Sequence, residues 1–313
     1  MGGRIVALAG GVGAARFLAG LVRVIAPERL VVIGNTGDDA EIHGLHIAPD
    51  LDTVTYTLAG LSDNARGWGL RGETFRCLEA LGRLGGETWF QLGDCDLATH
   101  LYRTRREREG ATLSEVTREI AAALGVRASI LPMSDSPVRT RVETRSGALE
   151  FQTYFVRRRA RDAVLGVSFA GARKARAAPG VLEAIRDASA IVICPSNPII
   201  SINPILAIPG IRNALRKTAA PVAAVSPIVG GRALKGPAAR MMKSMGLRAS
   251  AAQVAELYRD FVDIFVLDRA DQAQASRIAA LGMRAVVTNT IMSGSREKQA
   301  LAKVIVKELG VVR

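Results

Sequence analysis

Four carboxylates stand close together near the start of the chain and could hold a divalent cation. They are Asp38, Asp39, Asp50 and Asp52. Carboxylate oxygens are the ligands that Mg²⁺ prefers in proteins. Each pair could instead cap or flank a helix, since a helical pattern begins near Thr53. Two acidic pairs brought to one edge of a fold favour a Mg²⁺ site over two independent caps.

A glycine-rich loop precedes these acids. Gly10-Gly11-Val12-Gly13 lies between an apolar run, Arg4–Ala9, and a helical pattern, Ala14–Ile25. Backbone N–H groups in such a loop and the dipole of the following helix suit a phosphate, although a bare tight turn would have the same sequence. GxGxxG is not present, because Arg16 occupies the position of the third glycine, and the Walker pattern GxxxxGK[ST] is also absent. Acids beside a phosphate loop repel the ligand unless a cation lies between them, so the combination predicts metal-assisted chemistry on a phosphate ester or anhydride.

Three later loops offer further polar groups at strand ends. Cys194–Pro204 carries hydroxyl and amide side chains on a backbone stiffened by prolines, and Ser226–Gly231 repeats the theme. A rigid polar loop suits a base or a ribose, and a plain structural turn is the alternative. Leu131–Asp135 is both apolar and polar, which suits an aromatic ring carrying hydroxyls.

Short aliphatic runs alternate with helical patterns along most of the chain. The predicted strands are Arg4–Ala9, Leu30–Ile33, Ser129–Met133, Ala190–Cys194, Val222–Val225, Ile264–Leu267 and Ala285–Val287. The predicted helices are Ala14–Ile25, Thr53–Leu61, Thr74–Leu84, Leu97–Arg108, Leu113–Leu124, Gly180–Ala188, Ile211–Lys217, Gly236–Met245, Ala251–Tyr258, Asp271–Leu281 and Arg296–Leu309. This alternation predicts an α/β fold with a doubly wound, mainly parallel, Rossmann-like sheet, whose carboxyl edge would carry the site.

The middle of the chain breaks the alternation. Val138–Thr144 and Leu149–Phe155 alternate in polarity around Ser146-Gly147, which is the pattern of a β-hairpin. We therefore expect a single α/β domain over residues 1–313, with residues 138–162 forming a small appendage of β-hairpin and helix within it.

Composition limits the functional classes. The chain has 313 residues, of which 49% are hydrophobic, and no run of eighteen apolar residues predicts a membrane span. Its net charge of +13 attracts anions or spreads over solvated faces, but aromatics are only 4% and no nucleic-acid motif occurs, so we expect no nucleic-acid partner. Three separated cysteines and the absence of a signal-peptide pattern indicate a reduced, cytoplasmic protein.

These segments, in this order, resemble the 2-phospho-L-lactate transferases of deazaflavin coenzyme F-420 biosynthesis. The matching segments are GGVGAARFLAGL, NTGDD, HGLHIAPDLDTVTYTLAG, RGWG, LGDCDLATH, LPMSDSPV, CPSNPIISINPIL and SPIVGGRALKGPA, which span Gly10 to Ala238. The resemblance implies transfer of a phospho-lactyl, phosphoenolpyruvyl or related phospho-acid group from a guanosine-diphosphate-linked donor. The acceptor would be the ribityl hydroxyl of the deazaflavin Fo. GMP would leave, Mg²⁺ would be required, and the protein would be a homodimer.

The resemblance also implies roles for individual residues. The main metal ligand would be Asp38, with Asp39 beside it and with Asp50 and Asp52 in support. The residue that accepts the hydroxyl proton would be Asp50 or Asp52. The donor nucleotide would contact Gly10, Gly11, Gly13, Asn35, Ser196, Asn197, Pro198 and Ser226. The deazaflavin would contact Asp50, His100, Met133, Ser134 and Asp135.

One position departs from the family, and two other functional classes compete with it. Family members have Gly-Asp-Arg-Asp where this chain has Gly93-Asp94-Cys95-Asp96, so a guanidinium that could contact a phosphate or a ring is missing. A non-catalytic, nucleotide-sugar-binding regulator of the related gluconeogenesis-factor type would share the glycine loop and the acids. A nicotinamide-dependent oxidoreductase would need an intact GxGxxG and an acid at the end of the second strand. The sequence does not choose between lactyl, enolpyruvyl and glyceryl donors.

Overall fold

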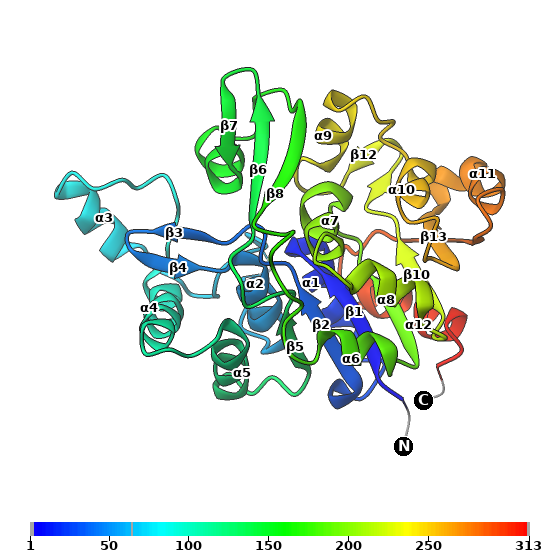
Figure 1. Cartoon of the computed structure of the whole chain (residues 1–313), viewed down its shortest axis with the longest axis horizontal. Helices are drawn as coiled ribbons and strands as arrows, with labels where there is room; N and C mark the ends of the chain where they lie inside the picture. Colours follow the sequence, from blue (N-terminus) through cyan, green and yellow to red (C-terminus); the bar gives the residue numbers. More distant parts are fainter. Residues whose placement is uncertain (1–2, 64, 312–313) are drawn as a thin grey trace.

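The computed structural model describes residues 3–63 and 65–311. Its centre is a seven-stranded parallel sheet with the strand order β14-β13-β10-β9-β1-β2-β5, which confirms the predicted doubly wound, Rossmann-like fold (Figure 1). The strands are β1 (Ile5–Ala9), β2 (Leu30–Gly34), β5 (Ser129–Pro132), β9 (Ala190–Ile193), β10 (Val222–Val225), β13 (Ile264–Asp268) and β14 (Arg284–Thr288).

Helices cover both faces of this sheet, and for this reason its strands are aliphatic at nearly every position. Val6 and Leu8 of β1 belong to one apolar core, whereas Ile5 and Ala7 belong to the other. The first core also contains side chains of α6 (Val181–Arg186), α7 (Asn203–Leu206), α8 (Ile211–Lys217), α9 (Ala238–Ser244), α10 (Ala251–Leu257) and α11 (Ala275–Ala279). The second contains side chains of α1 (Gly11–Leu21), α2 (Pro49–Leu58), α5 (Leu113–Ala123) and α12 (Ser295–Glu308).

The direction in which strands are added to the sheet reverses between β1 and β9. The chain runs outward from β1 to β2 and β5, and it then returns to β9 on the other side of β1 and continues through β10, β13 and β14. Loops that leave such a pair of strands diverge, and the crevice between them is where open α/β sheets bind ligands. Gly10 follows β1 and leads directly into the first turn of α1, which holds Gly11 and Gly13, and the loop Pro195–Asn197 follows β9.

A second, antiparallel sheet projects beside the main one, with the order β7-β6-β8 (Figure 1). The predicted hairpin is present as β6 (Arg139–Thr144) and β7 (Gly147–Glu150), and β8 (Gly166–Ala170), which the sequence did not predict, pairs with the other edge of β6. The predicted strand Leu149–Phe155 is wrong beyond Glu150. The chain is helical from Phe151, with a π-helix η2 at Thr153–Arg157, because this conformation buries Phe151 and Tyr154 together.

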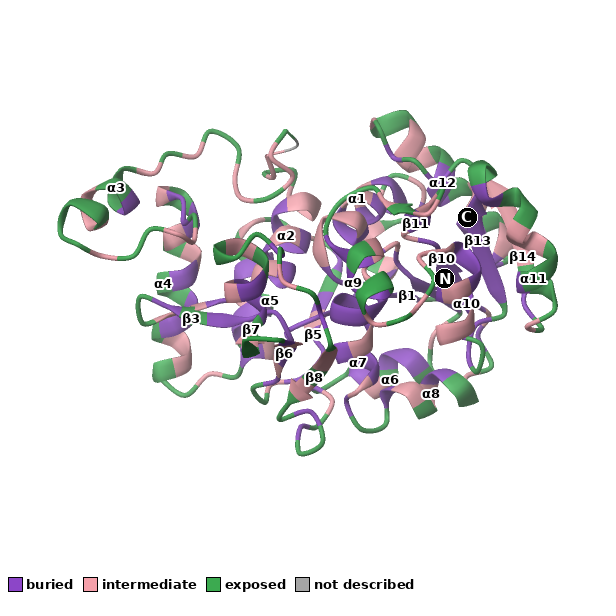
Figure 2. Cartoon of the chain, turned by 90° about the horizontal axis from the view of Figure 1, so that it is seen from above, coloured by how far each residue is buried: buried purple, intermediate pink, exposed green. Residues whose placement is uncertain are grey.

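A short hairpin and two helices form the side of the molecule beyond β2 (Figure 1). The hairpin joins β3 (Ala40–Ile42) to β4 (Leu45–Ile47) through His43-Gly44, both of which have positive φ, as a two-residue type I′ turn requires. The helices are α3 (Arg76–Arg83) and α4 (Asp94–Arg108). Figure 2 shows that buried residues concentrate in the sheet and its flanking helices, whereas the segment around α3 is mostly exposed.

Three helices near the predicted site begin earlier than the sequence predicts, and the first is α1, which begins at Gly11 rather than Ala14. α2 begins at Pro49 rather than Thr53, because proline suits the first helical position, and the acids Asp50 and Asp52 therefore lie within its first turn. α4 begins at Asp94 rather than Leu97. The remaining short elements are η1 (Pro27–Arg29), η3 (Pro198–Ile202), β11 (Ile228–Val229), β12 (Arg232–Ala233) and η4 (Arg269–Gln274). Among the described residues, no helix is both long enough and apolar enough to cross a bilayer.

Candidate active site

A cavity of about 500 Å³ lies at the carboxyl edge of the main sheet. Segments far apart in the sequence supply its polar lining, which includes Gly10, Gly11, Gly13, Asp38, Asp50, Ser196, Asn197 and Ser226. Its aromatic lining comes from Trp68, Phe90, Phe151 and Phe155. The cavity therefore joins a charged surface to an aromatic one, and it contains most of the residues that we expected at the donor.

The glycine loop packs tightly against its neighbours. The N–H of Gly10 donates to Ser196 Oγ at 3.4 Å, and the N–H of Gly11 donates to Asp50 Oδ1 at 2.8 Å. A Cβ at Gly13 would lie 2.2 Å from the carbonyl oxygen of Pro195, so only glycine allows α1 to approach the loop after β9 this closely. The first turn of α1 has no intrahelical partners for its N–H groups, which leaves donors at the cavity.

Asp50, in the first turn of α2, is buried beside the N-terminus of α1. Its Oδ2 accepts a hydrogen bond from Asn35 Nδ2 at 2.9 Å, while Oδ1 accepts from Gly11. Burial raises the pKa of Asp50 to about 6, although the hydrogen bonds from Asn35 and Gly11 act in the opposite direction. A carboxyl group with such a pKa exchanges protons readily near neutral pH.

Asp38 reaches the same cavity from the segment after β2. Its carboxylate lies 3.5 Å from Thr140 Oγ1, and its carbonyl oxygen accepts from Gln152 Nε2 at 2.8 Å. Burial, followed by the nearby charge of Asp50, raises the pKa of Asp38 well above its usual range. No basic side chain in the described ranges forms an ion pair with Asp38 or Asp50. Two buried carboxylates that share a cavity without a basic partner fit a divalent cation.

The other two acids of the predicted cluster do not line this cavity. Asp39 lines a second cavity of about 380 Å³, and its Oδ2 lies 3.0 Å from Nε2 of His46. Asp52 lies on the face of α2 that points away from this cavity, where it is buried and pairs with Arg103 of α4. The structure therefore groups Asp38 with Asp50, and it separates the expected metal pair of Asp38 and Asp39.

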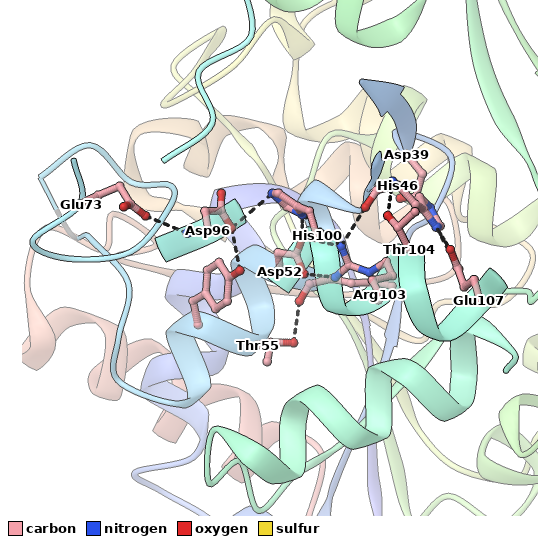
Figure 3. A network of polar contacts seen from close by, with 12 residues as sticks. Asp39, His46, Asp52, Thr55, Glu73, Asp96, His100, Arg103, Thr104 and Glu107 are labelled. Atoms are coloured by element: carbon pink, nitrogen blue, oxygen red, sulfur yellow. Dashed lines mark hydrogen bonds and ion pairs between the residues drawn. The ribbon is translucent and has the colours of Figure 1, made fainter. Parts of the chain in front are cut away.

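Asp52 belongs to a buried polar network between α2 and α4 (Figure 3). Both Asp52 oxygens accept from the Arg103 guanidinium, and Tyr56 Oη donates to Asp96 Oδ1 at 2.6 Å. The His100 ring lies between the acids, with Nδ1 3.7 Å from Asp52 and Nε2 3.4 Å from Asp96. These three groups are close enough to share a metal, but Arg103 already neutralises Asp52, so the donor set does not fit a further cation.

The strand end expected at the deazaflavin lies apart from the main cavity. β5 is the edge strand of the sheet, and β2 separates it from β1. Met133 is fully buried in the core, and Ser134 Oγ donates to the carbonyl of Arg176 at 2.6 Å. Asp135 lines the second cavity and accepts from the N–H and Oγ of Ser114. None of Met133, Ser134 and Asp135, nor the buried His100, lines the main cavity.

The remaining expected donor contacts have structural roles of their own. Asn35 is fully buried and binds Asp50 and the N–H of Gly37. Asn197 lines the cavity, but its Oδ1 caps η3 by accepting from the N–H of Ile199 at 2.9 Å. The buried Pro198 begins η3, and Ser226 Oγ donates to the carbonyl of Ile228.

Sequence reasoning missed the aromatic lining and the basic residues of the cavity. Phe151 and Phe155 stack with their ring centroids 5.4 Å apart, as their spacing of four on a helix allows, but the segment had been predicted as a strand. The basic residues of the cavity lining are Arg16, Arg66 and Lys235. Cys95, which stands where family members have arginine, is exposed, lies outside the cavity lining, and donates its N–H to Glu73.

Comparison with known proteins covers nearly the whole chain. Residues 5–308 match the family model of 2-phospho-L-lactate transferase CofD. The chain belongs to this family. Among its relatives, a 2-phospho-L-lactate transferase of Methanosarcina barkeri is 40% identical over 96% of this chain and 97% of its own length. A phosphoenolpyruvate transferase of Streptomyces griseus is 42% identical over 96% of each chain.

A solved structure has the same fold as this chain. A protein of the UPF0052 family from Bacillus halodurans superposes with a TM-score of 0.65 at 17% identity, covering 98% of this chain and 99% of its own. At this identity the likeness extends to the fold alone.

Proposed function

We propose that this protein transfers a phospho-acid group from a guanosine-diphosphate-linked donor to the ribityl hydroxyl of the deazaflavin Fo and releases GMP. The observation that carries the proposal is the single cavity that combines a glycine-rich turn, two buried carboxylates with no ion-pair partner in the described part of the chain, and an aromatic lining. Membership of the 2-phospho-L-lactate transferase family and the printed names of its relatives support the same reaction class.

The polar lining suits a diphosphate. N–H groups at the start of α1 and the positive end of its dipole attract phosphate oxygens. Asp50 already accepts from Gly11 there, so a bare phosphate would meet a carboxylate at close range. A Mg²⁺ ion held by Asp38, with Asp50 in support, would remove that repulsion and stabilise charge on the diphosphate when it is bound.

The reaction itself needs little covalent chemistry from the protein. The primary hydroxyl oxygen of Fo forms a bond to the phosphorus that bears the organic acid, and the bond from that phosphorus to the bridging oxygen breaks. GMP leaves with the bridging oxygen and its electron pair. Asp50 takes the hydroxyl proton, since its carboxylate lines the cavity whereas Asp52 is occupied by Arg103. Positioning and charge stabilisation provide most of the rate enhancement in such transfers.

The aromatic lining suits the deazaflavin ring. Phe151 and Phe155 lie stacked in the helical segment that contains η2, and Trp68 and Phe90 come from the segment between α2 and α4. Flat rings offset against one another gain more than their buried area alone provides. A ring held here would carry its ribityl chain into the cavity that Asp38 and Asp50 line.

The proposal does not specify which organic acid the donor carries. Relatives named 2-phospho-L-lactate transferase and relatives named phosphoenolpyruvate transferase are about equally similar to the chain, so identity does not select between lactyl, enolpyruvyl and glyceryl donors. The cytoplasmic location and the homodimer also stay predictions.

The test is an assay of the purified protein with Fo, Mg²⁺ and each guanylylated acid in turn. GMP release and the mass of the deazaflavin product are followed together. We expect one donor to give a product heavier by one phospho-acid unit, with GMP formed in equal amount. No product with any donor, together with tight binding of a nucleotide sugar, would support the non-catalytic regulator instead.

A further inference from the structure

Helix α2 lies between the cavity and the buried network. Residues two apart on an α-helix point in nearly opposite directions, and Asp50 accordingly lines the cavity while Asp52 faces α4. The contacts that hold Asp52 in place therefore also fix the rotation and position of the helical turn that carries Asp50. The network is closed from solvent, since the exposure of Arg103 is 2% and that of His100 is 1%.

Arg103 is the side chain that connects three elements. Its guanidinium binds both oxygens of Asp52 on α2, and Nη1 also donates to the carbonyl oxygen of His46 on β4 at 3.3 Å (Figure 3). The hairpin β3–β4 begins directly after Asp38 and Asp39. The His46 ring bridges Asp39 and Glu107, so the hairpin is tied to α4 at a second point.

We propose that Arg103 is a positioning residue that holds the two cavity carboxylates, Asp38 and Asp50, at the separation that the bound cation and the diphosphate require. The inference deepens the proposed function and rests on it for the identity of the reaction. Its geometric basis is independent, because it follows from one guanidinium that fastens the helix of Asp50 and the hairpin next to Asp38 to the same side of α4.

Asp38 and Asp50 must be held in position by other contacts, because their carboxylates repel each other. Asp38 and Asp50 line one cavity, no basic side chain in the described ranges forms an ion pair with either of them, and their charges disfavour close approach. Arg103 offsets this by a two-pronged contact that lysine cannot reproduce, because an ammonium lacks the planar fork of donors. Displacement of a reacting group by about 1 Å can cost about a hundredfold in rate even when the altered residue lies outside the reaction centre.

Three variants and one control test the proposal in the full-length protein. Arg103→Met removes the contact, Arg103→Lys keeps the charge without the fork, and Arg103→Met with Asp52→Leu removes both partners and leaves no unpaired buried charge. The control is Arg106→Met, which breaks a two-pronged but partly exposed pair on the same helix, between Arg106 and Glu119 of α5, outside both the cavity and the network. Melting temperature, Mn²⁺ affinity by electron paramagnetic resonance, KM for each substrate and kcat are measured for each.

We expect the three Arg103 variants to bind Mn²⁺ about tenfold more weakly and to lose about tenfold or more in kcat, with little change in KM for Fo. The double variant should regain thermal stability without regaining Mn²⁺ affinity or kcat, and Arg106→Met should keep both. Wild-type Mn²⁺ affinity in the double variant, or equal losses in Arg106→Met, would overturn the positioning role. Should the wild-type protein lack transferase activity, the Mn²⁺ measurements alone still decide the inference.

Discussion

Asp50 and Asp52 lie two residues apart on α2, yet Asp50 lines the main cavity and Asp52 is paired with Arg103 in a closed network. One turn of helix therefore carries both a candidate reactive group and the group that anchors it. Substitutions at the two positions should separate loss of turnover from loss of stability.

Asp50→Asn and Asp52→Asn should have contrasting effects. Asp50→Asn should lower kcat about a hundredfold or more but cost little stability, because removal of a buried charge offsets the loss of one of the two hydrogen-bond acceptors that Gly11 and Asn35 use. Asp52→Asn should lower the free energy of unfolding by about 3–5 kcal/mol, since the Arg103 charge would then be buried without its partner. Urea unfolding together with steady-state kinetics measures both. Equal stability of the two variants would contradict this division.

Asp38→Asn should lower turnover at least about a hundredfold at saturating Mg²⁺, the scale of a lost electrostatic group in an active site. Asp39→Asn is the matched control, because Asp39 lies on the second cavity and pairs with His46. We expect that variant to keep a larger share of its activity. Near-wild-type activity of Asp38→Asn would remove Asp38 from the metal site.

Gly13→Ala should weaken donor binding and destabilise the protein. The new methyl group would meet the carbonyl oxygen of Pro195, and α1 would have to move away from the loop after β9 at a cost of about 1–3 kcal/mol. Gly166→Ala serves as the control, since its new Cβ would be in ordinary contact with Glu143 at 3.7 Å. Calorimetric titration with GDP and thermal melting compare the two. Unchanged GDP affinity in Gly13→Ala would exclude the glycine loop from the donor site.

Phe155→Ala should raise KM for Fo about threefold to tenfold, because the variant loses one ring of the stacked pair with Phe151. Affinity for GDP should not change. Leu84→Ala removes a side chain that is 86% exposed and should affect neither quantity. A rise in the GDP dissociation constant with constant KM for Fo would place the nucleotide, rather than the deazaflavin, against these rings.

His46→Gln should make stability less dependent on alkaline pH. Burial lowers the pKa of His46, but hydrogen bonds and charges from Asp39 and Glu107 outweigh burial and raise it to about 9. The protonated ring therefore stabilises the fold fully below its unfolded pKa of about 6.5, by about 3 kcal/mol, and this contribution disappears as pH rises through 9. Urea unfolding of metal-free protein at about pH 6 and about pH 10 should show a stability gap between wild type and variant that closes at the higher pH. A constant gap would contradict the assignment.

Much of the site follows from the positions of the strands along the chain, which the sequence reveals. The residues after β1, β2, β9 and β10 meet at one carboxyl edge, and Asp38, Ser196 and Ser226 therefore line one cavity with the glycine loop. Continuous aliphatic runs bounded by glycine and proline identify such strands without tertiary information. Their loops can be assigned to a common edge on that basis alone.

The remaining features of the site could not be predicted, because they depend on the direction in which helical side chains point and on partners distant in the sequence. Asp52 faces away from the cavity because α2 begins at Pro49, and a helix that began at Thr53 would have left both acids in a loop. Its partner Arg103 is 51 positions further along the chain, in a basic run that gave no sign of burial. Met133 follows a strand as expected, but β5 lies at the edge of the sheet, and position within the sheet cannot be read from a local pattern.

The three-stranded sheet β7-β6-β8 is an insertion between strands of the main sheet, of the kind that protein engineers remove to shorten a chain. This part of the chain nevertheless supports the site: the N–H of Thr140 in β6 donates to the carbonyl of Gly37 at 2.7 Å, and Gln152, in the helical segment after β7, donates to the carbonyl of Asp38. Phe151 and Phe155 reach the cavity from the same segment. A minimal version of this protein would therefore have to retain the insertion, because a shortened scaffold would keep the parallel sheet and lose the support of Asp38.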